Sequence, residues 1–312
     1  MKLAVSRFFG NLHHAMRFGS RVCRNRVKGG MSWLDRALGF PILHFIYRWR
    51  IGHRLDLRNP KTFTAKVQWR KVFDRNPLLV TFSDKLAMRK YVARVLGEDR
   101  MRQITLPTLG VTDHPTAKWL AGFGTNVAIK ANHGSTMNIF ILEGSKPDYS
   151  ALAWQASTWQ RLNFGQSRHE WANWKVSKKV LVERLVHLPD GRLADDCKFW
   201  VFDGKVHVFA LSHDRFGNHT LNFYDRDRNW LEFGYGKIEP DRGFPKPNFY
   251  EEMRDIAEQL GQGIDFVRVD YLYGEDCFYL NELTIYPVSG FGAFEPEQTD
   301  VTFGALWHLP KR

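Results

Sequence analysis

The chain has 312 residues, of which 44% are hydrophobic, 25% charged and 14% aromatic. This composition is typical of a globular protein with a sizeable core, and it excludes a disordered or fibrous chain. No stretch approaches about eighteen uninterrupted apolar residues, and the first seven residues lack a continuous apolar segment. We therefore expect neither a membrane-spanning helix nor a cleaved signal peptide. Three distant cysteines without metal-binding spacing (Cys23, Cys197 and Cys277) predict a reducing, cytoplasmic location.

The net charge of +12 is concentrated at the beginning of the chain. Residues 1–55 hold eleven Lys or Arg residues and one acid, Asp35, a balance of +10 that leaves +2 for all other residues. Clustered cations can bind an anionic membrane surface, an acidic polymer or nucleic acid, and nucleic acid is the least favoured of these partners here. Aromatic residues beside arginines in 39–50 suit a membrane interface. The alternative is a solvated basic helix, with 40–49 packed as ordinary core.

The first half of the chain shows helical patterns separated by short apolar runs. The expected helices are 64–74, 83–97 and 148–164, the second beginning at Ser83 and ending at Gly97. The expected strands are 126–131 and 179–183. The expected loops are 110–115 and the small-residue segment 132–136.

From residue 197 the pattern changes to strands. Runs at 198–202 and 205–210 flank Asp203-Gly204, which is a strong hairpin signal. An acidic amphipathic helix is expected over 249–260. A second hairpin follows, with strands over 266–272 and 277–283 around the turn 274–276. This order of elements predicts an α+β fold rather than a doubly wound parallel sheet.

The second hairpin carries a pair of acidic residues. If its loop has three residues, Asp270 lies opposite Leu280, and Glu282 projects from the same face because strand side chains repeat every two residues. Like charges that face each other are unfavourable unless a cation lies between them, and magnesium prefers such oxygen ligands. A loop of even length would place the two carboxylates on opposite faces. The alternative is a pair of solvated strand carboxylates.

Two basic residues suggest phosphate chemistry. Arg268 shares the face of Asp270 and could stabilise a phosphoryl group or an acyl-phosphate, or could simply form a salt bridge with Asp270. Lys130 closes a predicted strand before a flexible loop, so its ammonium and the loop N–H groups could reach phosphates. By spacing alone, Lys130 could equally be a surface lysine before a turn.

Together these residues resemble the ATP-grasp superfamily, and specifically its TupA-like family of teichuronopeptide biosynthesis. The resemblance covers about residues 57–300, and the order and spacing of its short motifs are specific. The motifs are Asn59-Pro60-Lys61-Thr62-Phe63, Ser83-Asp84-Lys85 with Arg89, Lys130-Ala131-Asn132-His133-Gly134-Ser135, Asp195-Asp196-Cys197-Lys198-Phe199, the segment 214–225, Val267-Arg268-Val269-Asp270, Asn281-Glu282-Leu283-Thr284 and Pro287-Val288-Ser289-Gly290.

The resemblance implies an ATP-grasp fold, in which two α+β subdomains grip ATP, here preceded by a basic helical N-terminal arm. The domains expected on this basis are the arm (1–55), a helical region (56–117), a lid subdomain (118–186) and a core with the metal and substrate site (187–312). The reaction it implies is phosphorylation of a carboxylate by ATP, followed by attack of an amine on the acyl-phosphate to form an amide.

The resemblance also implies roles for individual residues. Those expected to bind ATP are Lys130, Gly134, Ser135, Glu183, Arg184, Leu185 and Lys198, with 183–185 at the adenine hinge. Those expected to bind magnesium, in the form of two ions, are Asp270, Glu282 and Thr284. Those expected near phosphoryl transfer are Arg268, Arg215 and Asn222. His133, His213, Ser289 and Gly290 are candidates for substrate contacts.

One position departs from the family pattern. Many ATP-grasp enzymes carry Asn two residues after the glutamate, where this chain has Thr284, so the coordination of a second metal ion is in question. This departure keeps open a non-catalytic nucleotide-binding scaffold. Two further alternatives to a ligase are an ATP-grasp kinase and a glycosyltransferase that uses Asp225 and Asp227 as a D-x-D metal site.

The favoured hypothesis is an ATP- and magnesium-dependent carboxylate–amine ligase. The family likeness implies a uronic acid of a cell-surface polysaccharide, capsular or teichuronic in type, as the carboxylate substrate and an amino acid or other amine as its partner. The expected location is cytoplasmic, at the inner face of the bacterial membrane if the basic arm binds anionic lipid.

Overall fold

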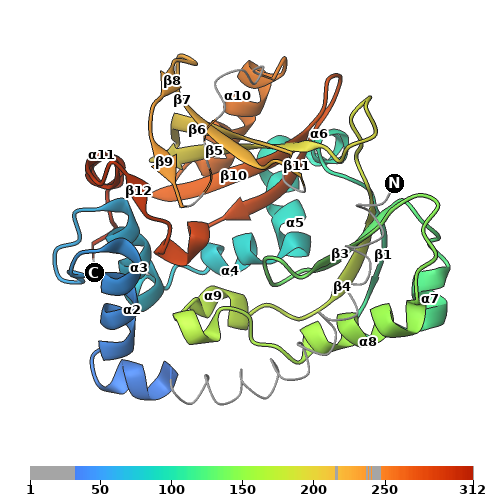
Figure 1. The fold of residues 1–312 in the computed structure, drawn as a ribbon, viewed down its shortest axis with the longest axis horizontal. Coiled ribbons are helices and arrows are strands. Elements are labelled where there is room, and N and C mark those ends of the chain that lie inside the picture. Colours follow the sequence, from blue (N-terminus) through green and yellow to red (C-terminus); the bar gives the residue numbers. More distant parts are fainter. Residues whose placement is uncertain (1–31, 215–216, 237, 239, 241–246, 312) are drawn as a thin grey trace. The chain divides into compact units, whose positions relative to one another are not determined.

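The computed structural model describes residues 32–214, 217–236, 238, 240 and 247–311 (Figure 1). The chain folds into two compact units. The small unit contains the described residues up to Gly39 together with Pro107–Leu185, and the large unit contains Phe40–Leu106 and the chain from Val186 onward. Both combine helices with antiparallel sheets, so the predicted α+β class is confirmed. In the part of the chain that is described, no helix is long and apolar enough to cross a membrane.

The small unit is built on a four-stranded sheet with the order β1-β4-β2-β3. Its strands are β1 (Thr108–Thr112), β2 (Val127–Ala131), β3 (Asn138–Ile141) and β4 (Val180–Arg184). Its helices are α7 (Ala117–Ala121), α8 (Tyr149–Gln160), the 3-10 turn η1 (Gln166–Arg168) and α9 (Trp171–Trp174). The predicted strands at 126–131 and 179–183 and the predicted helix at 148–164 are thereby confirmed.

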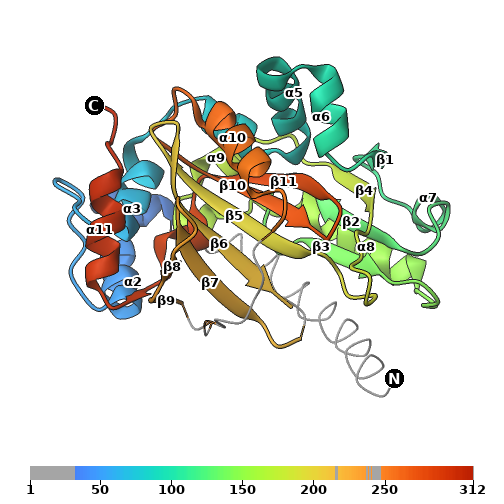
Figure 2. The ribbon, with the colours of Figure 1, turned by 90° about the horizontal axis from the view of Figure 1, so that it is seen from above.

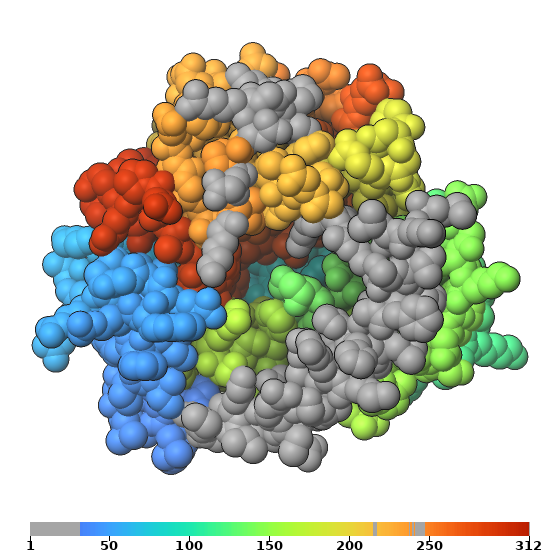
Figure 3. All heavy atoms as spheres, viewed as in Figure 1, coloured from blue at the N-terminus to red at the C-terminus, as the bar shows by residue number. Residues whose placement is uncertain are grey.

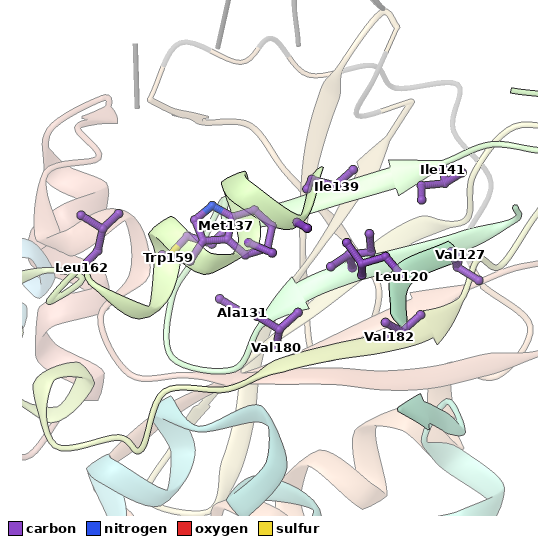
Figure 4. Close-up of a cluster of buried hydrophobic side chains, with 13 residues drawn as sticks. Leu120, Val127, Ala131, Met137, Ile139, Ile141, Trp159, Leu162, Val180 and Val182 are labelled. Carbon is purple, nitrogen blue, oxygen red and sulfur yellow. The ribbon is translucent and has the colours of Figure 1, made fainter. Parts of the chain in front are cut away.

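One face of this sheet is apolar because alternate side chains of its strands point toward α8. Val127, Ile129 and Ala131 of β2 belong to one buried cluster with Val180 and Val182 of β4 (Figure 4). The same cluster contains Trp159 of α8, which lies beside Met137. The opposite face therefore carries the intervening residues of β2 and β4.

The boundary of the small unit differs from the predicted one. The segment 110–115 was expected to be a loop, but β1 covers its first half and pairs with β4 from Thr108↔Glu183 to Thr112↔Val180. This pairing draws residues from Pro107 onward into the small unit, which therefore begins before the predicted lid boundary at 117/118. The loop was predicted because Gly110 and Pro115 are typical of turns. The structure is decided instead by strand pairing with a distant segment.

The large unit is built on a six-stranded antiparallel sheet with the order β11-β10-β5-β6-β7-β8 (Figures 1 and 2). Its strands are β5 (Asp195–Phe202), β6 (Lys205–His213), β7 (Thr220–Asp225), β8 (Trp230–Leu231), β10 (Phe266–Tyr273) and β11 (Phe278–Thr284), and a separate pair is formed by β9 (Gly234–Tyr235) and β12 (Phe294–Glu295). Its helices are α2 (Pro41–Ile51), α3 (Phe63–Phe73), α4 (Leu78–Ser83), α5 (Lys85–Leu96), α6 (Glu98–Ile104), α10 (Tyr250–Gly261), the 3-10 turn η2 (Pro287–Gly290) and α11 (Gln298–Leu306).

Helices cover the two faces of this sheet unequally. On one face, Tyr250 of α10 packs against Phe199 and Phe209. On the other face, Phe63 of α3 packs against Phe266, and α11 lies beside them at the same end of the sheet. That second face also carries the polar residues of the candidate site.

The predicted start of the second helix needs a correction. Ser83 ends α4, and Asp84 caps α5 because its carboxylate accepts the N–H of Leu86 at 2.9 Å. The predicted end is confirmed, since Gly97 follows α5 with a φ of 89° that favours glycine. Residues 1–31, which hold most of the predicted basic arm, lie outside the described residues.

Candidate functional site

The two acidic residues of the second hairpin face each other across β10 and β11. Tyr273 pairs with Phe278, so the loop between the strands has four residues, and the predicted three-residue loop is wrong. A regular hairpin with this loop would pair Asp270 with Asn281 and turn Glu282 to the other face. Instead the register shifts after Tyr271, and Asp270 pairs directly with Glu282. The extra residue, Asn281, forms a β-bulge that restores the predicted common face of the two carboxylates.

Neighbouring strands add further polar groups to this face. Asp270 pairs on its other side with Lys198 of β5, so Lys198, Asp270 and Glu282 form one row across three strands. Arg268 pairs with Thr284 on one side and with Trp200 on the other, which makes the next row. Paired residues share a face, so the sheet brings together five of the residues predicted for the site.

Arg268 holds the Asp270 carboxylate with two hydrogen bonds. Its Nε donates to Oδ1 at 2.6 Å and its Nη2 donates to Oδ2 at 2.5 Å, and the guanidinium also lies over the Trp200 ring. Burial lowers the pKa of Arg268, but the attraction of Asp270 outweighs this and leaves the pKa above its ordinary value. Burial raises the pKa of Asp270, against the opposing effect of Arg268, and the Glu282 charge raises it further.

Thr284 lies between the two carboxylates. Its hydroxyl is 3.3 Å from both Asp270 Oδ2 and Glu282 Oε1, so it can donate to either, and it accepts from Arg268 Nη2 at 3.4 Å. The Thr284 hydroxyl is therefore within reach of both carboxylates, at the sequence position where the family pattern has Asn.

These donors fit a magnesium ion. Asp270, Glu282 and Thr284 offer only hard oxygen atoms, and each carboxylate oxygen bound by Arg268 retains a second lone pair. Two carboxylates directly opposite each other on adjacent strands repel unless a cation lies near them. Among the residues described, no group of three or more His, Cys, Asp or Glu residues forms a ready metal cage. The arrangement therefore resembles a magnesium site completed by phosphate and water rather than a closed protein site.

Two residues near this row were not predicted. Lys85, at the start of α5, places its Nζ 3.7 Å from Glu282 Oε2. Asp196 Oδ2 lies 3.3 Å from the Nζ of Lys198. Lys85 stands in the motif Ser83-Asp84-Lys85 and Asp196 stands two residues before Lys198 on β5, so both signals were present in the sequence.

The small unit contributes a buried ion pair. Lys130 of β2 and Glu183 of β4 point from the polar face of the sheet, and Lys130 Nζ lies 2.8 Å from Glu183 Oε2. Both side chains are at least nine-tenths buried. Glu183 thus pairs with the lysine predicted to bind phosphate. Lys130 is the penultimate residue of its strand, as the sequence predicted.

The loop after β2 is held by a side-chain clamp. Asn132 donates to the Ser177 carbonyl at 2.8 Å and accepts the N–H of Lys179 at 2.7 Å. Its neighbour His133 is fully buried, and Ser135 is exposed. A Cβ at Gly134 would lie 2.3 Å from the Met137 sulfur, so only glycine fits there without movement of that side chain. Phosphate binding by the N–H groups of this loop stays a prediction.

The predicted adenine hinge coincides with the division between the two units. Leu185 is the last residue of the small unit, and Arg184 ends β4 with an exposed side chain. The N–H of Leu185 already donates to the Asn126 carbonyl at 3.2 Å. The Leu185 N–H is therefore already bonded within the protein.

Two of the described residues predicted for the site, Asn222 and His213, lie away from the Asp270 row. Asn222 is fully buried and pairs with Leu211, which pairs with Cys197, so Asn222 lies on the opposite face of the sheet. His213 donates or accepts at 2.9 Å from Asp195 Oδ2, at the far end of β6. Arg215 lies outside the described residues. The sequence could not show this separation because faces depend on the register of strands that are distant in the chain.

Helix α3 fixes the segment that was predicted to contact substrate. Lys71 donates to the Ser289 carbonyl at 2.9 Å, and Gln68 donates to the Gly290 carbonyl at 2.8 Å. Gly290 has a φ of 68°, and a Cβ there would lie 2.9 Å from the Val67 Cβ. Both conditions require glycine. This part of η2 is thus held rigidly by buried contacts.

Asp225 and Asp227, the two residues of the alternative D-x-D metal site, lie in a turn. Asp225 accepts the N–H groups of Asp227 and Asn229, at 2.9 and 2.8 Å, and therefore closes the turn after β7. This geometry is that of an Asx turn, so it gives no support to a metal site at Asp225 and Asp227.

The comparisons with known proteins agree with this geometry. The family model described as TupA-like ATP-grasp matches residues 65–308, which is more than three quarters of the chain. The chain belongs to the TupA-like ATP-grasp family. Its fold is the ATP-grasp fold that the sequence motifs predicted. No curated protein matches this TupA-like chain.

Solved structures similar to this TupA-like protein include several ATP-grasp proteins. The ATP-grasp ligase PsnB with a minimal precursor is 15% identical, covers 67% of this chain and 53% of its own, and has a TM-score of 0.36. D-Alanine–D-alanine ligase from Bacillus anthracis with ATP is 13% identical. The match covers 66% of this chain and 55% of the ligase chain, with a TM-score of 0.39. N5-carboxyaminoimidazole synthase from Aspergillus clavatus is 11% identical. The match covers 70% of this chain and 46% of the synthase chain, with a TM-score of 0.36. The chain spans about half the length of these proteins, and its family membership rests on the sequence match.

Proposed function

We propose that this TupA-like protein is an ATP-dependent carboxylate–amine ligase that acts through an acyl-phosphate. The observation that supports this proposal most strongly is the row of Asp270 and Glu282 with Arg268 and Thr284 beside it. Family membership supports ATP as the nucleotide.

The proposed reaction has two steps. A substrate carboxylate oxygen attacks the γ-phosphorus of ATP, and the bond to the bridging oxygen breaks as ADP leaves. The nitrogen of an amine then attacks the carbonyl carbon of the acyl-phosphate, inorganic phosphate leaves with its bonding electron pair, and the nitrogen loses a proton. Arg268 would stabilise the charge on the transferred group, since its guanidinium is buried and already fixed in position.

We propose that Asp270, Glu282 and Thr284 hold magnesium, in the form of two ions. The bound metal would supply charge neutralisation at the β- and γ-phosphates. Lys130 and Lys198 would bind phosphate oxygens by charge-assisted hydrogen bonds, and the loop of Gly134 and Ser135 would offer N–H groups. Glu183, Arg184 and the carbonyl of Leu185 would contact the adenosine part.

We propose a uronic acid of a cell-surface polysaccharide as the carboxylate substrate and an amino acid or other amine as its partner. The TupA-like family match and the cationic beginning of the chain support this choice, because a polyuronate or a lipid-linked precursor is anionic. His133, His213, Ser289 and Gly290 are proposed to contact these substrates, and Arg215 is proposed to act near the phosphoryl group, whereas Asn222 is no longer proposed there because it lies on the opposite face of the sheet.

We also propose that the protein works in the cytoplasm beside an anionic membrane, with residues 1–55 as the region of contact. The +10 balance of this region supports the proposal, since each cation near an anionic surface contributes about 1 kcal/mol.

The test is ATP turnover to ADP with a panel of uronic acids, each with and without amino acids. We expect ADP formation that requires both partners and that is lost in Asp270→Asn, while Asp227→Asn in the exposed turn retains it. ADP and acyl-phosphate formation without an amine requirement would indicate a kinase. ATP binding without turnover across the panel would indicate a scaffold, and dependence on Asp225 and Asp227 would contradict the ATP-grasp mechanism.

A further inference from the structure

Exposed apolar side chains are concentrated at the beginning of the described chain. Among the described residues, thirteen large hydrophobic residues are exposed, and six of them fall within residues 33–49. Three of the six lie on α2 at helical spacing, namely Ile42, Phe45 and Trp49, and the two aromatic residues are 73% and 70% exposed. Single exposed apolar residues are ordinary, but an aligned stripe on one helix marks an interaction surface.

The helix that carries this stripe is anchored through its opposite face. Leu43 and Tyr47 are buried in one cluster with residues of α3, which include Trp69. The hydroxyl of Tyr47 also lies 2.8 Å from the Thr64 hydroxyl at the start of α3. The core-facing side of α2 is therefore already packed. In Figure 3 the blue atoms of this region form part of the molecular surface at the lower left.

The charged residues of α2 itself, on which the stripe lies, are both positive. Arg48 and Arg50 flank Trp49, and the Arg50 guanidinium lies 4.6 Å from the centre of the Trp49 ring. The sequence contains no acidic residue between Asp35 and Asp56. The carboxylate of Asp56 already accepts two hydrogen bonds, from the backbone N–H groups of Arg58 and Asn59. Aromatic rings beside arginines complement the headgroups and upper acyl chains of an anionic bilayer.

We propose that α2 is a membrane-docking surface, in which Ile42, Phe45 and Trp49 enter the headgroup region of an anionic membrane while Arg48 and Arg50 bind lipid phosphates. The inference rests on the proposed contact of residues 1–55 with a membrane, and it assigns that contact to one helix face. It does not depend on the ligase reaction.

The test is co-sedimentation of the full chain with phosphatidylcholine vesicles that either contain or lack phosphatidylglycerol. We expect binding to the anionic vesicles only. The double variant Phe45→Ser/Trp49→Ser should bind at least about tenfold more weakly, since it removes both exposed rings. Arg48→Gln/Arg50→Gln should lose about 25-fold at low salt, at roughly fivefold for each cation. The matched control is Trp154→Ser, whose side chain is exposed on α8 of the other unit.

A second measurement reports the depth of one ring. Brominated lipid should quench part of the tryptophan fluorescence of the wild type, and Trp49→Phe should lose this part although the variant still binds. Equal binding of wild type and Phe45→Ser/Trp49→Ser would overturn the α2 surface and leave the membrane proposal intact. Absence of wild-type binding would overturn both. A wild-type dimer that becomes a monomer in the double variant would identify a second copy as the occupant, and would also overturn the proposal. ATP turnover in solution tests the ligase separately.

Discussion

The ammonium of Lys130 lies 2.8 Å from the carboxylate of Glu183, and both groups are buried in the small unit. The pair joins β2 and β4 on the polar face of a sheet whose other face packs against α8. A buried ion pair is weak evidence for stability by itself, because desolvation opposes the attraction. The pair contains Lys130, the lysine predicted to bind phosphate, so its function can be tested through ATP binding.

Replacement of Lys130 by Met should weaken ATP binding about tenfold to a hundredfold, because one charge-assisted contact to phosphate is lost. The measurement is the ATP dissociation constant by calorimetry. Lys118→Met is the matched control, since Lys118 is exposed on α7 of the same unit. An unchanged dissociation constant for Lys130→Met would contradict the assignment of this lysine to the nucleotide.

Glu183→Gln should lower the melting temperature, because it leaves the buried Lys130 ammonium without its carboxylate partner. Saturating ATP should raise the melting temperature of this variant by more than it raises that of the wild type, since the phosphates replace the missing charge. Thermal unfolding with and without ATP provides the check. Equal shifts in the two proteins would indicate that ATP does not reach Lys130.

Glu282→Gln should reduce the rate of ATP turnover by roughly 10³-fold, because a magnesium ligand is lost. The side chain is partly exposed, so this variant should fold normally. Thr284→Val should weaken the apparent magnesium affinity about tenfold, whereas Thr284→Ser should retain it, since serine keeps the hydroxyl between the two carboxylates. Magnesium titrations of turnover measure both effects. Equal affinities for the Val and Ser variants would exclude the hydroxyl as a ligand.

Asp300 should make stability depend on pH in a predictable direction. It lies on α11, accepts the N–H of Thr64 at 2.8 Å and is buried. Burial raises its pKa above the ordinary value, against its hydrogen bonds to Thr64. The native state therefore binds the proton more tightly than the unfolded state. The resulting stabilisation is present below the ordinary Asp pKa and is lost as the pH rises through the raised value.

Asp300→Asn removes this dependence. As the pH rises from about 4, the wild type loses this stabilisation and the variant does not. The free energy of unfolding of the variant minus that of the wild type should therefore increase and then level off. Urea unfolding of both proteins across that range gives the difference. A difference that falls with rising pH would contradict the direction of the pKa shift.

Local signals in the sequence were sufficient for most of the elements. The hairpin around Asp203-Gly204, the helix after Asp148 and the strand that contains Lys130 were all predicted from local sequence patterns. The motif order also identified the family. β1 was missed because a short segment with turn residues becomes a strand only by pairing with β4, about seventy residues away.

The sequence by itself determined which chemical groups are available: two carboxylates, an arginine two residues before the first, and a lysine before a small-residue loop. Their arrangement was decided only by tertiary structure. The bulge at Asn281 turns Glu282 toward Asp270, and strand pairing places Lys198 beside them and Asn222 on the other face. Contact between Lys85 and Glu282 joins a helix to a strand nearly two hundred residues later. Register and packing between distant segments depend on the whole buried core, and no local pattern contains them.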